Sequence, residues 1–156
     1  MSAIDPNRLI FIVVGVQLPA ELGDRPLAYR IAEHVQRMID EKIGKSPEGQ
    51  LPRLAPAVIS DVYYLNNENI QHRPAISVGG PGVNGLSGQL VNELPTIIAI
   101  ENTLILQMDL DVEDPRVSVW GMDHILTVRA VELMIDKGHL EHFVNKLIEQ
   151  LPEEDE

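Results

Sequence analysis

Two short segments of the sequence combine residue types that could bind a ligand. The first joins an apolar stretch to a helical pattern and is rich in residues that permit tight turns: Gly79, Gly80, Gly82 and Asn84. A glycine loop between a strand and a helix can point backbone N–H groups at an anion, because the first N–H groups of a helix have no partner inside it. This segment therefore predicts a site for a small anionic, nucleotide-like ligand.

The glycine loop has a second interpretation, in which it only packs a strand against a helix. It lacks the Lys-Ser/Thr pair of a phosphate-binding Walker loop, and its glycines do not follow the G-x-G-x-x-G spacing. In that case glycine supplies a positive φ and Asn84 caps the helix. If Gly82 holds that positive φ, we expect Gly82→Ala to cost on the order of 1 kcal/mol. In an anion site the same change would remove binding without altering stability.

The second segment brings an aromatic ring, a carboxylate and an imidazole close together in the sequence: Trp120, Asp123 and His124. A carboxylate beside an imidazole can move protons, and an indole ring can stack on a planar ligand. The alternative is that Asp123 caps the following helix, since Asp is a preferred capping residue, and that His124 lies on the surface. Both interpretations remain open, and no catalytic residue is assigned.

The remaining polar clusters do not predict a metal site. The acidic run 109–114 has the composition of a calcium-binding string, but Asp114 stands where an EF-hand loop requires glycine and Trp120 where it requires glutamate. His139 and His142 share a helix face without a third ligand nearby in the sequence. The absence of cysteine excludes thiolate metal sites, disulfides and cysteine nucleophiles. No metal is predicted, and any cofactor is unknown.

Apolar stretches predict the elements that hold these segments. Residues 9–16 are apolar throughout and rich in β-branched side chains, which is typical of a strand buried on both faces. Asp24 stands where a helix N-cap belongs, two residues before Pro26. The other expected strands are 57–65, 75–78 and 116–120, with a hairpin over 96–110; helices are expected over 24–42, 86–94, 124–136 and 140–151.

This alternation predicts a single α/β domain over residues 1–152, followed by an acidic tail, 153–156. We expect three layers, a mainly parallel sheet and one antiparallel hairpin at an edge. In such sheets ligands bind beyond the carboxyl ends of the strands. The loops 15–17, 79–85 and 120–124 are therefore expected to gather there and to bring the two candidate segments together.

The composition argues against partners that attract positive charge. The 156 residues include 24 acidic and 12 basic side chains, which gives a formal net charge of −12. Affinity for a phosphate backbone comes mostly from Lys and Arg, and the sequence has no basic cluster, so neither nucleic acid nor an anionic membrane surface is expected as a partner. The first residues contain no basic region before an apolar run and no signal-type cleavage site, so we expect a cytoplasmic location.

The segments ISVGGPGVNGLSGQLVNEL and VSVWGMDHILTVRAVELM resemble a conserved α/β domain of archaeal S-layer and related cell-surface proteins. That domain pairs a strand–Gly-Gly-Pro-x-x-Asn–helix element with a later strand–Gly–five residues–Thr element. The resemblance spans about residues 75–135 and implies a domain used for assembly or ligand contact, without a catalytic set. The matching residues are Gly79, Gly80, Pro81 and Asn84 in the first element and Gly121, Thr127 and Ala130 in the second.

Two functions follow from these observations. The first is a non-enzymatic binding or self-assembly module that presents an α/β surface to a partner or to copies of itself. The alternative is a small-molecule-binding protein or an enzyme that acts on an anionic, nucleotide-like ligand at the glycine loop. We favour the first, because no catalytic constellation emerges. The apolar stretches within 96–110 also predict a homo-oligomer, since an uncovered edge strand tends to pair with another chain.

Overall fold

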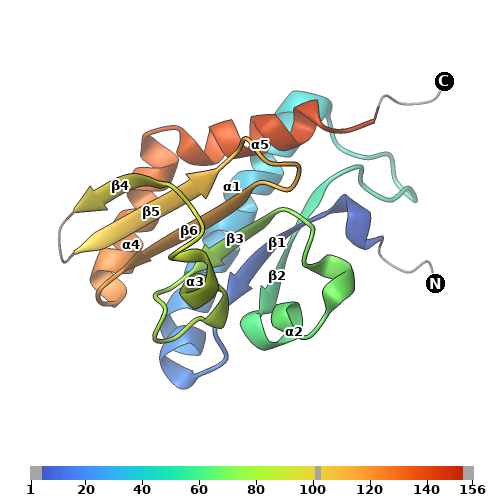
Figure 1. Cartoon of the computed structure of the whole chain (residues 1–156). Coiled ribbons are helices and arrows are strands. Elements are labelled where there is room, and N and C mark those ends of the chain that lie inside the picture. Colours follow the sequence, from blue (N-terminus) through green and yellow to red (C-terminus); the bar gives the residue numbers. More distant parts are fainter. Residues whose placement is uncertain (1–4, 101–102, 153–156) are drawn as a thin grey trace.

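One sheet of six strands forms the centre of the molecule (Figure 1). The computed structural model describes residues 5–100 and 103–152. The strands are β1 (Leu9–Val14), β2 (Ala55–Ser60), β3 (Ala75–Val78), β4 (Thr96–Ile100), β5 (Leu104–Asp109) and β6 (Arg116–Gly121). Their order is β2-β1-β3-β6-β5-β4; the first four are parallel, and β5 and β4 form an antiparallel edge. The prediction of an α/β fold with a mainly parallel sheet and an edge hairpin is confirmed.

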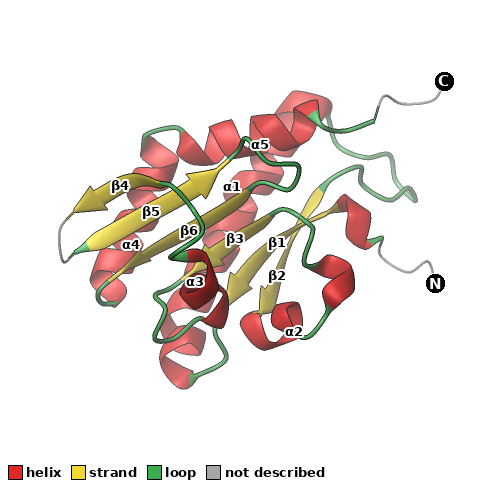
Figure 2. Ribbon diagram, viewed as in Figure 1, coloured by secondary structure: helices red, strands yellow, loops and turns green. Residues whose placement is uncertain are grey.

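Helices pack on the sheet through the alternating side chains of its strands. Ile10, Ile12 and Val14 belong to the apolar cluster shared with the three long helices, whereas Phe11 and Val13 belong to the cluster on the opposite face. Figure 2 shows the long helices together behind the sheet and the short ones in front of it. The long helices are α1 (Arg25–Ile43), α4 (His124–Asp136) and α5 (His139–Glu149); the short ones are α2 (Asp61–Leu65) and α3 (Gly85–Leu90).

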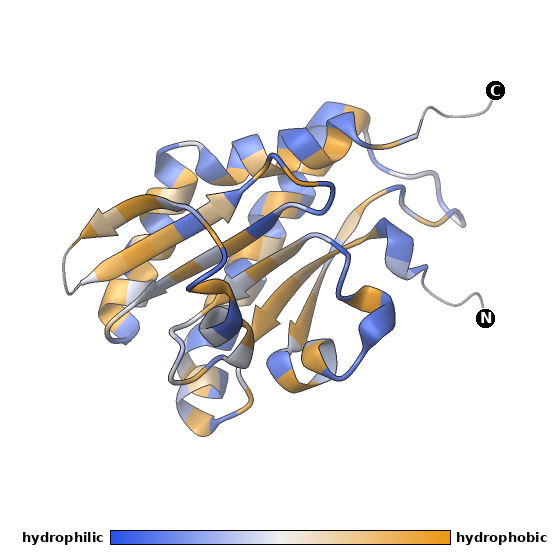
Figure 3. Ribbon diagram, viewed as in Figure 1, coloured by the Kyte–Doolittle hydropathy of each residue, from blue (hydrophilic) through white to orange (hydrophobic). Residues whose placement is uncertain are grey.

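The central strand β1 is buried along residues 10–14, as its run of apolar residues predicts. In Figure 3 this strand is coloured as hydrophobic over most of its length. Small polar side chains instead fill the space between α3 and strands β3 and β6. The hydroxyls of Ser77 and Ser87 lie 2.6 Å apart, and Ser118 Oγ lies 3.5 Å from Ser87 Oγ. These buried hydroxyls satisfy one another and allow α3 to approach the sheet closely.

The order of the strands creates a crevice at the carboxyl ends of the parallel strands. The chain leaves β1 towards α1, which packs on one face of the sheet, and leaves β3 towards α3, which packs on the other face. Because β1 and β3 are neighbours, their outgoing loops diverge to opposite faces. In open α/β sheets ligands bind at such a divergence. The topology therefore points to the loops after β1, β3 and β6.

Three expected elements differ from the structure. The helix expected over 86–94 ends at Leu90, and residues 91–93 form a turn. The stretch 57–65 is not one strand, because Ser60 Oγ accepts a hydrogen bond from Tyr63 N at 3.0 Å and so caps α2 after β2 has ended. Asp24 does not cap α1, because a π-helical turn (Ala20–Asp24) runs directly into that helix. The Asp24 side chain makes no capping bond and is free for another role. The predicted acidic tail, 153–156, lies outside the described residues.

Within residues 5–100 and 103–152, none of the helices has both the length and the apolar character required to cross a bilayer.

Candidate ligand-binding site

A pocket of about 470 Å³ lies at the carboxyl ends of β3 and β6, and we call it the strand-end pocket. Its volume is within the usual range for small-molecule sites. It is lined by Pro19 and Asp24, by residues 80–83, and by residues 120–124 together with Thr127. The loops after β1, β3 and β6 thus meet here, although the first contributes Pro19 and Asp24 rather than residues 15–17.

Asn84 fixes the glycine loop and does not line the pocket. Its Nδ2 donates to the carbonyl oxygens of Val13 in β1 and Val78 in β3, both at 2.9 Å. Its Oδ1 accepts from the N–H groups of Leu86 and Ser87 at the start of α3. The expected helix cap is therefore confirmed. The same buried side chain also ties two strands to a helix, which holds the loop in one position.

Most N–H groups of the glycine loop are bonded within the chain, which leaves few for an anion. Gly85 N donates to Asp61 Oδ2 at 2.8 Å, and Val83 N and Asn84 N both donate to Gly80 O. A phosphate cradle requires several free N–H groups that converge on one point. The loop geometry favours the packing interpretation. The donors that already have a partner are the N–H groups of Gly79, Val83, Asn84, Gly85, Leu86 and Ser87.

Close packing requires glycine at position 79 and not at position 82. Gly79 has a φ of +103°, and a Cβ atom there would overlap the Asp24 carboxylate. The φ of Gly82 lies outside the left-handed region, and a Cβ atom there would meet no other atom within 4 Å. The expected cost of Gly82→Ala depended on a positive φ that Gly82 does not have. An alanine at position 82 is therefore expected to leave stability nearly unchanged.

The end of β6 is held as firmly as the glycine loop. Gly121 N donates to Thr127 Oγ1 at 3.0 Å, and a Cβ atom on Gly121 would overlap the backbone of Leu126. Asp123 Oδ1 accepts from Leu126 N at 2.8 Å, so Asp123 caps α4 as the structural interpretation expected. The five-residue spacing between Gly121 and Thr127 thus has a physical reason, because it joins a strand end to the first turn of a helix.

Trp120 forms one side of the strand-end pocket. A Cβ atom built on Gly80 would lie 3.4 Å from Trp120 Cε3, so the indole ring packs against the glycine backbone. The indole Nε1–H is buried and has no acceptor among the described residues. Trp120 is only partly buried overall, which leaves part of its surface available to a planar ligand.

Asp24 is the residue of this pocket that the sequence did not indicate. Its side chain is only 6% exposed and accepts no hydrogen bond from the described residues, and its electrostatic neighbour is the His124 imidazole. Burial raises the pKa of the Asp24 carboxyl above its ordinary value of 3.8, and the nearby His124 imidazole opposes part of that rise. A largely buried carboxylate without a hydrogen-bond donor destabilises a fold, which marks Asp24 as a candidate binding group.

The ionisable side chains that line the strand-end pocket are two carboxylates, Asp24 and Asp123, and the imidazole of His124. Its lining contains no Lys or Arg. The nearest basic residue in the sequence, Arg25, pairs with Glu21 at 3.1 Å. The pocket therefore offers negative rather than positive charge to a ligand.

Strongly exposed apolar side chains lie close in the sequence to residues that line the strand-end pocket. They come from the loop after β1 and from the start of α4, and Gly23 lies against the His124 ring where these two segments touch. Scattered exposed apolar residues are ordinary, but several on two touching loops suggest a binding surface. Each of the four residues is at least 65% exposed: Leu18, Leu22, Met122 and Ile125.

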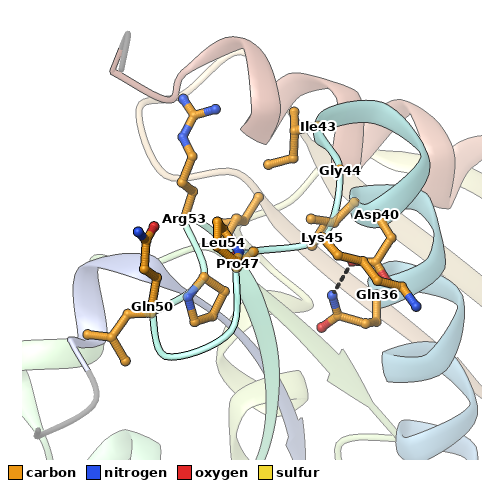
Figure 4. A pocket seen from close by; sticks show the side chains of 13 residues that line it. Gln36, Asp40, Ile43, Gly44, Lys45, Pro47, Gln50, Arg53 and Leu54 are labelled. Carbon is orange, nitrogen blue, oxygen red and sulfur yellow. Dashed lines mark hydrogen bonds between the residues drawn. The ribbon is translucent and has the colours of Figure 1, made fainter. Parts of the chain in front are cut away.

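A second pocket, the loop pocket, lies at the opposite end of the parallel strands (Figure 4). It has a volume of about 420 Å³ and is lined by the end of α1 and by residues 44–47 and 50–54. Arg8 donates to the carbonyl oxygens of Leu51 and Pro52 and so holds this segment from one side. The carboxylate in this pocket, Asp40, accepts a hydrogen bond from Gln36 at 3.0 Å, which Figure 4 shows as a dashed line.

Of the residues that the sequence singled out, five line the strand-end pocket: Gly80, Gly82, Trp120, Asp123 and His124. Gly79 and Asn84 lie behind its wall and hold it in place. Within the described residues no group of three or more His, Asp or Glu side chains could hold a metal ion. Neither the acidic run 109–114 nor the pair His139 and His142 forms such a group.

Comparison of the chain with protein-family models and with curated proteins gives no match. The function must therefore be argued from the geometry of the two pockets and of the sheet edges.

Proposed function

We propose that this chain is a non-enzymatic binding module that takes a small molecule in the strand-end pocket. The observation that carries the proposal is Asp24, a largely buried carboxylate on the wall of a pocket that accepts no hydrogen bond from the described residues. A buried charged group lowers the stability of the fold, and such groups occur mainly at binding and catalytic sites. The position at the carboxyl ends of β3 and β6 is where α/β sheets bind ligands.

The walls of the pocket also support a binding role, because they are held before any ligand arrives. Asn84 fixes the loop after β3, and Thr127 fixes the end of β6. Binding costs less when the site does not have to be ordered first. A largely preformed, mostly apolar pocket with a few placed polar groups is typical of small-molecule sites.

The experiment is a fragment screen by ¹⁵N NMR on the wild-type chain and on two variants. Gly82→Leu places a side chain at the pocket wall, where a Cβ atom meets no neighbour. Gln89→Leu adds the same side chain to an exposed position of α3, away from the pocket lining, and serves as the control. We expect fragments that shift the resonances of residues 80–83 and 120–124 in the wild type and in Gln89→Leu, and fewer of them in Gly82→Leu. A library in which no fragment shifts these resonances would contradict the proposal.

Self-assembly is the second candidate, and the observation that favours it is strand β4. This edge strand has the sequence TIIAI, without a charge or a proline, and Ile97 and Ile100 are 44% and 48% exposed. The other edge strand, β2, carries Pro56, which blocks pairing. An unprotected edge pairs readily with a second copy, and the resemblance to S-layer domains implies the same use.

Sedimentation tests this second candidate. We expect a homo-oligomer at micromolar concentration for the wild type and a monomer for Ile100→Lys, because a charge on an edge strand opposes pairing. Val62→Lys changes an equally exposed apolar residue on α2 and should stay assembled. A wild-type chain that sediments only as a 17.4 kDa species would contradict self-assembly and leave the strand-end pocket unaffected.

A further inference from the structure

The charge of the strand-end pocket identifies the class of ligand that it fits. Asp123 uses one carboxylate oxygen to cap α4, and its side chain is exposed to solvent. Asp24 makes no such bond and is buried, so it is the charged group that gains most from a ligand. A buried acceptor is satisfied best by a donor that also carries positive charge, because such hydrogen bonds are about twice as strong as neutral ones.

The indole of Trp120 adds a second requirement, for a flat apolar body. Its ring packs on the backbone of Gly80 and keeps part of its surface exposed beside the pocket. Flat groups stack on such a ring, and cations are attracted to its face. Pro81, Val83 and Met122 line the same space with apolar surface.

An anion is disfavoured by the same geometry. The pocket lining contains no Lys or Arg, and most N–H groups of the glycine loop are already bonded. The net charge of −12 adds a field that attracts cations and repels anions over the whole surface. The anionic, nucleotide-like ligand suggested by the glycine loop in the sequence would meet the Asp24 carboxylate, and among the described residues of the lining His124 is the side chain that can carry a positive charge.

We propose that the strand-end pocket selects organic cations, with an amine or amidinium group on Asp24 and a flat apolar body against Trp120. This inference rests on the proposed function, since it assigns a ligand class to the same pocket.

Three probes of one shape separate charge from shape: benzamidine, benzamide and benzoate, which are cationic, neutral and anionic at neutral pH. The chain contains one tryptophan, so the single indole N–H resonance reports on Trp120 directly. We expect benzamidine to bind about tenfold more tightly than benzamide, the gain of a charge-assisted over a neutral hydrogen bond. Benzoate should bind most weakly of the three.

Two variants test the role of Asp24. Asp24→Asn should lower the affinity for benzamidine to that for benzamide, because the variant lacks the carboxylate charge that favours the cationic amidinium over the neutral amide. Asp111→Asn removes the same charge from an exposed turn outside the pocket and should keep the preference. The comparison of the three probes on the wild type does not require either variant to fold.

Each outcome decides the inference. A preference for benzamidine that is lost in Asp24→Asn and kept in Asp111→Asn supports it. Equal binding of benzamidine and benzamide, or tightest binding of benzoate, overturns the ligand class but leaves the pocket as a binding site. If none of the three probes shifts the Trp120 indole, the ligand class is overturned, and the fragment screen then decides separately whether the pocket binds any small molecule.

Discussion

The two pockets of this protein lie at opposite ends of the same parallel strands and have similar volumes, about 470 and 420 Å³. The walls of the strand-end pocket are set by buried side chains, Asn84 and Thr127, that bond to strand ends. The loop pocket is lined mostly by exposed side chains of residues 44–53 and by one face of α1. The strand-end pocket therefore has walls fixed by buried hydrogen bonds, whereas the loop pocket has walls formed mainly by exposed side chains.

The two pockets also differ in their carboxylates. Asp40 in the loop pocket has a hydrogen-bond donor in Gln36, whereas Asp24 in the strand-end pocket has no hydrogen-bond donor among the described residues and only the electrostatic influence of His124. A satisfied carboxylate on the surface needs no functional explanation. An unsatisfied buried carboxylate does, because it lowers the stability of the fold that contains it. The two cavities are similar in volume. They differ in that the Asp24 carboxylate of the strand-end pocket lacks a hydrogen-bond donor.

The largest expected effect on stability comes from replacing a glycine of the strand-end pocket by alanine. Gly121→Ala should destabilise the protein by about 3 kcal/mol, because its Cβ atom would overlap the backbone at Leu126, which cannot move cheaply. Gly44→Ala in the loop pocket meets no atom, and its cost of about 1–3 kcal/mol comes only from the strain of its positive φ. Urea unfolding of the two variants measures both values. A Gly121→Ala variant as stable as the wild type would show that the end of β6 is not tightly packed.

Loss of the Asn84 side chain should have the next largest effect. Asn84→Ala removes the cap of α3 and the donors for two buried carbonyls, which together should cost about 2–3 kcal/mol. Gln50→Ala in the loop pocket changes an exposed side chain and should stay within about 0.5 kcal/mol of the wild type. Thermal or urea unfolding distinguishes these outcomes. Equal stabilities would mean that the glycine loop is not held by Asn84.

The smallest expected effect has the opposite sign. Asp24→Asn should stabilise the protein at neutral pH, by about 1 kcal/mol, because burial disfavours the charged carboxylate by more than the nearby His124 imidazole offsets. Since the pKa of Asp24 is raised on folding, the wild type loses stability as pH rises from 3.8 through the folded pKa, so the gain should vanish below pH 3.8. Asp40→Asn should give no such gain. Unfolding curves across that pH range test the prediction, and a destabilised Asp24→Asn variant at neutral pH would contradict it.

Sequence patterns predicted the parts of this structure that depend on local chemistry. The apolar run of β1, the edge hairpin, and the caps Asn84 and Asp123 all follow from residue type and spacing, because strands and caps are determined by near neighbours. The glycine loop and the Trp120 segment were predicted to lie together because both follow parallel strands, and both line the strand-end pocket.

Asp24 could not be found in this way. Asp shortly before Pro is a common signature of a helix start, and only the π-helical turn ahead of α1 turns its carboxylate away from that role. The start of α2 at Asp61 was hidden for a related reason. The apolar and aromatic residues of 57–65 fit a strand, while the cap on Ser60 is a single hydrogen bond that overrides this pattern.

The most direct test of the account is to ask which carboxylate a bound cation needs. Benzamidine at a hundredfold excess over its dissociation constant should stabilise the wild type by about 2.7 kcal/mol, and Asp40→Asn by the same amount. Asp24→Asn at the same benzamidine concentration should gain only about 1.4 kcal/mol, because tenfold weaker binding reduces the hundredfold excess to tenfold. Unfolding with and without benzamidine measures all three. Equal stabilisation of the three proteins, or a loss confined to Asp40→Asn, would contradict the assignment of the strand-end pocket as the binding site.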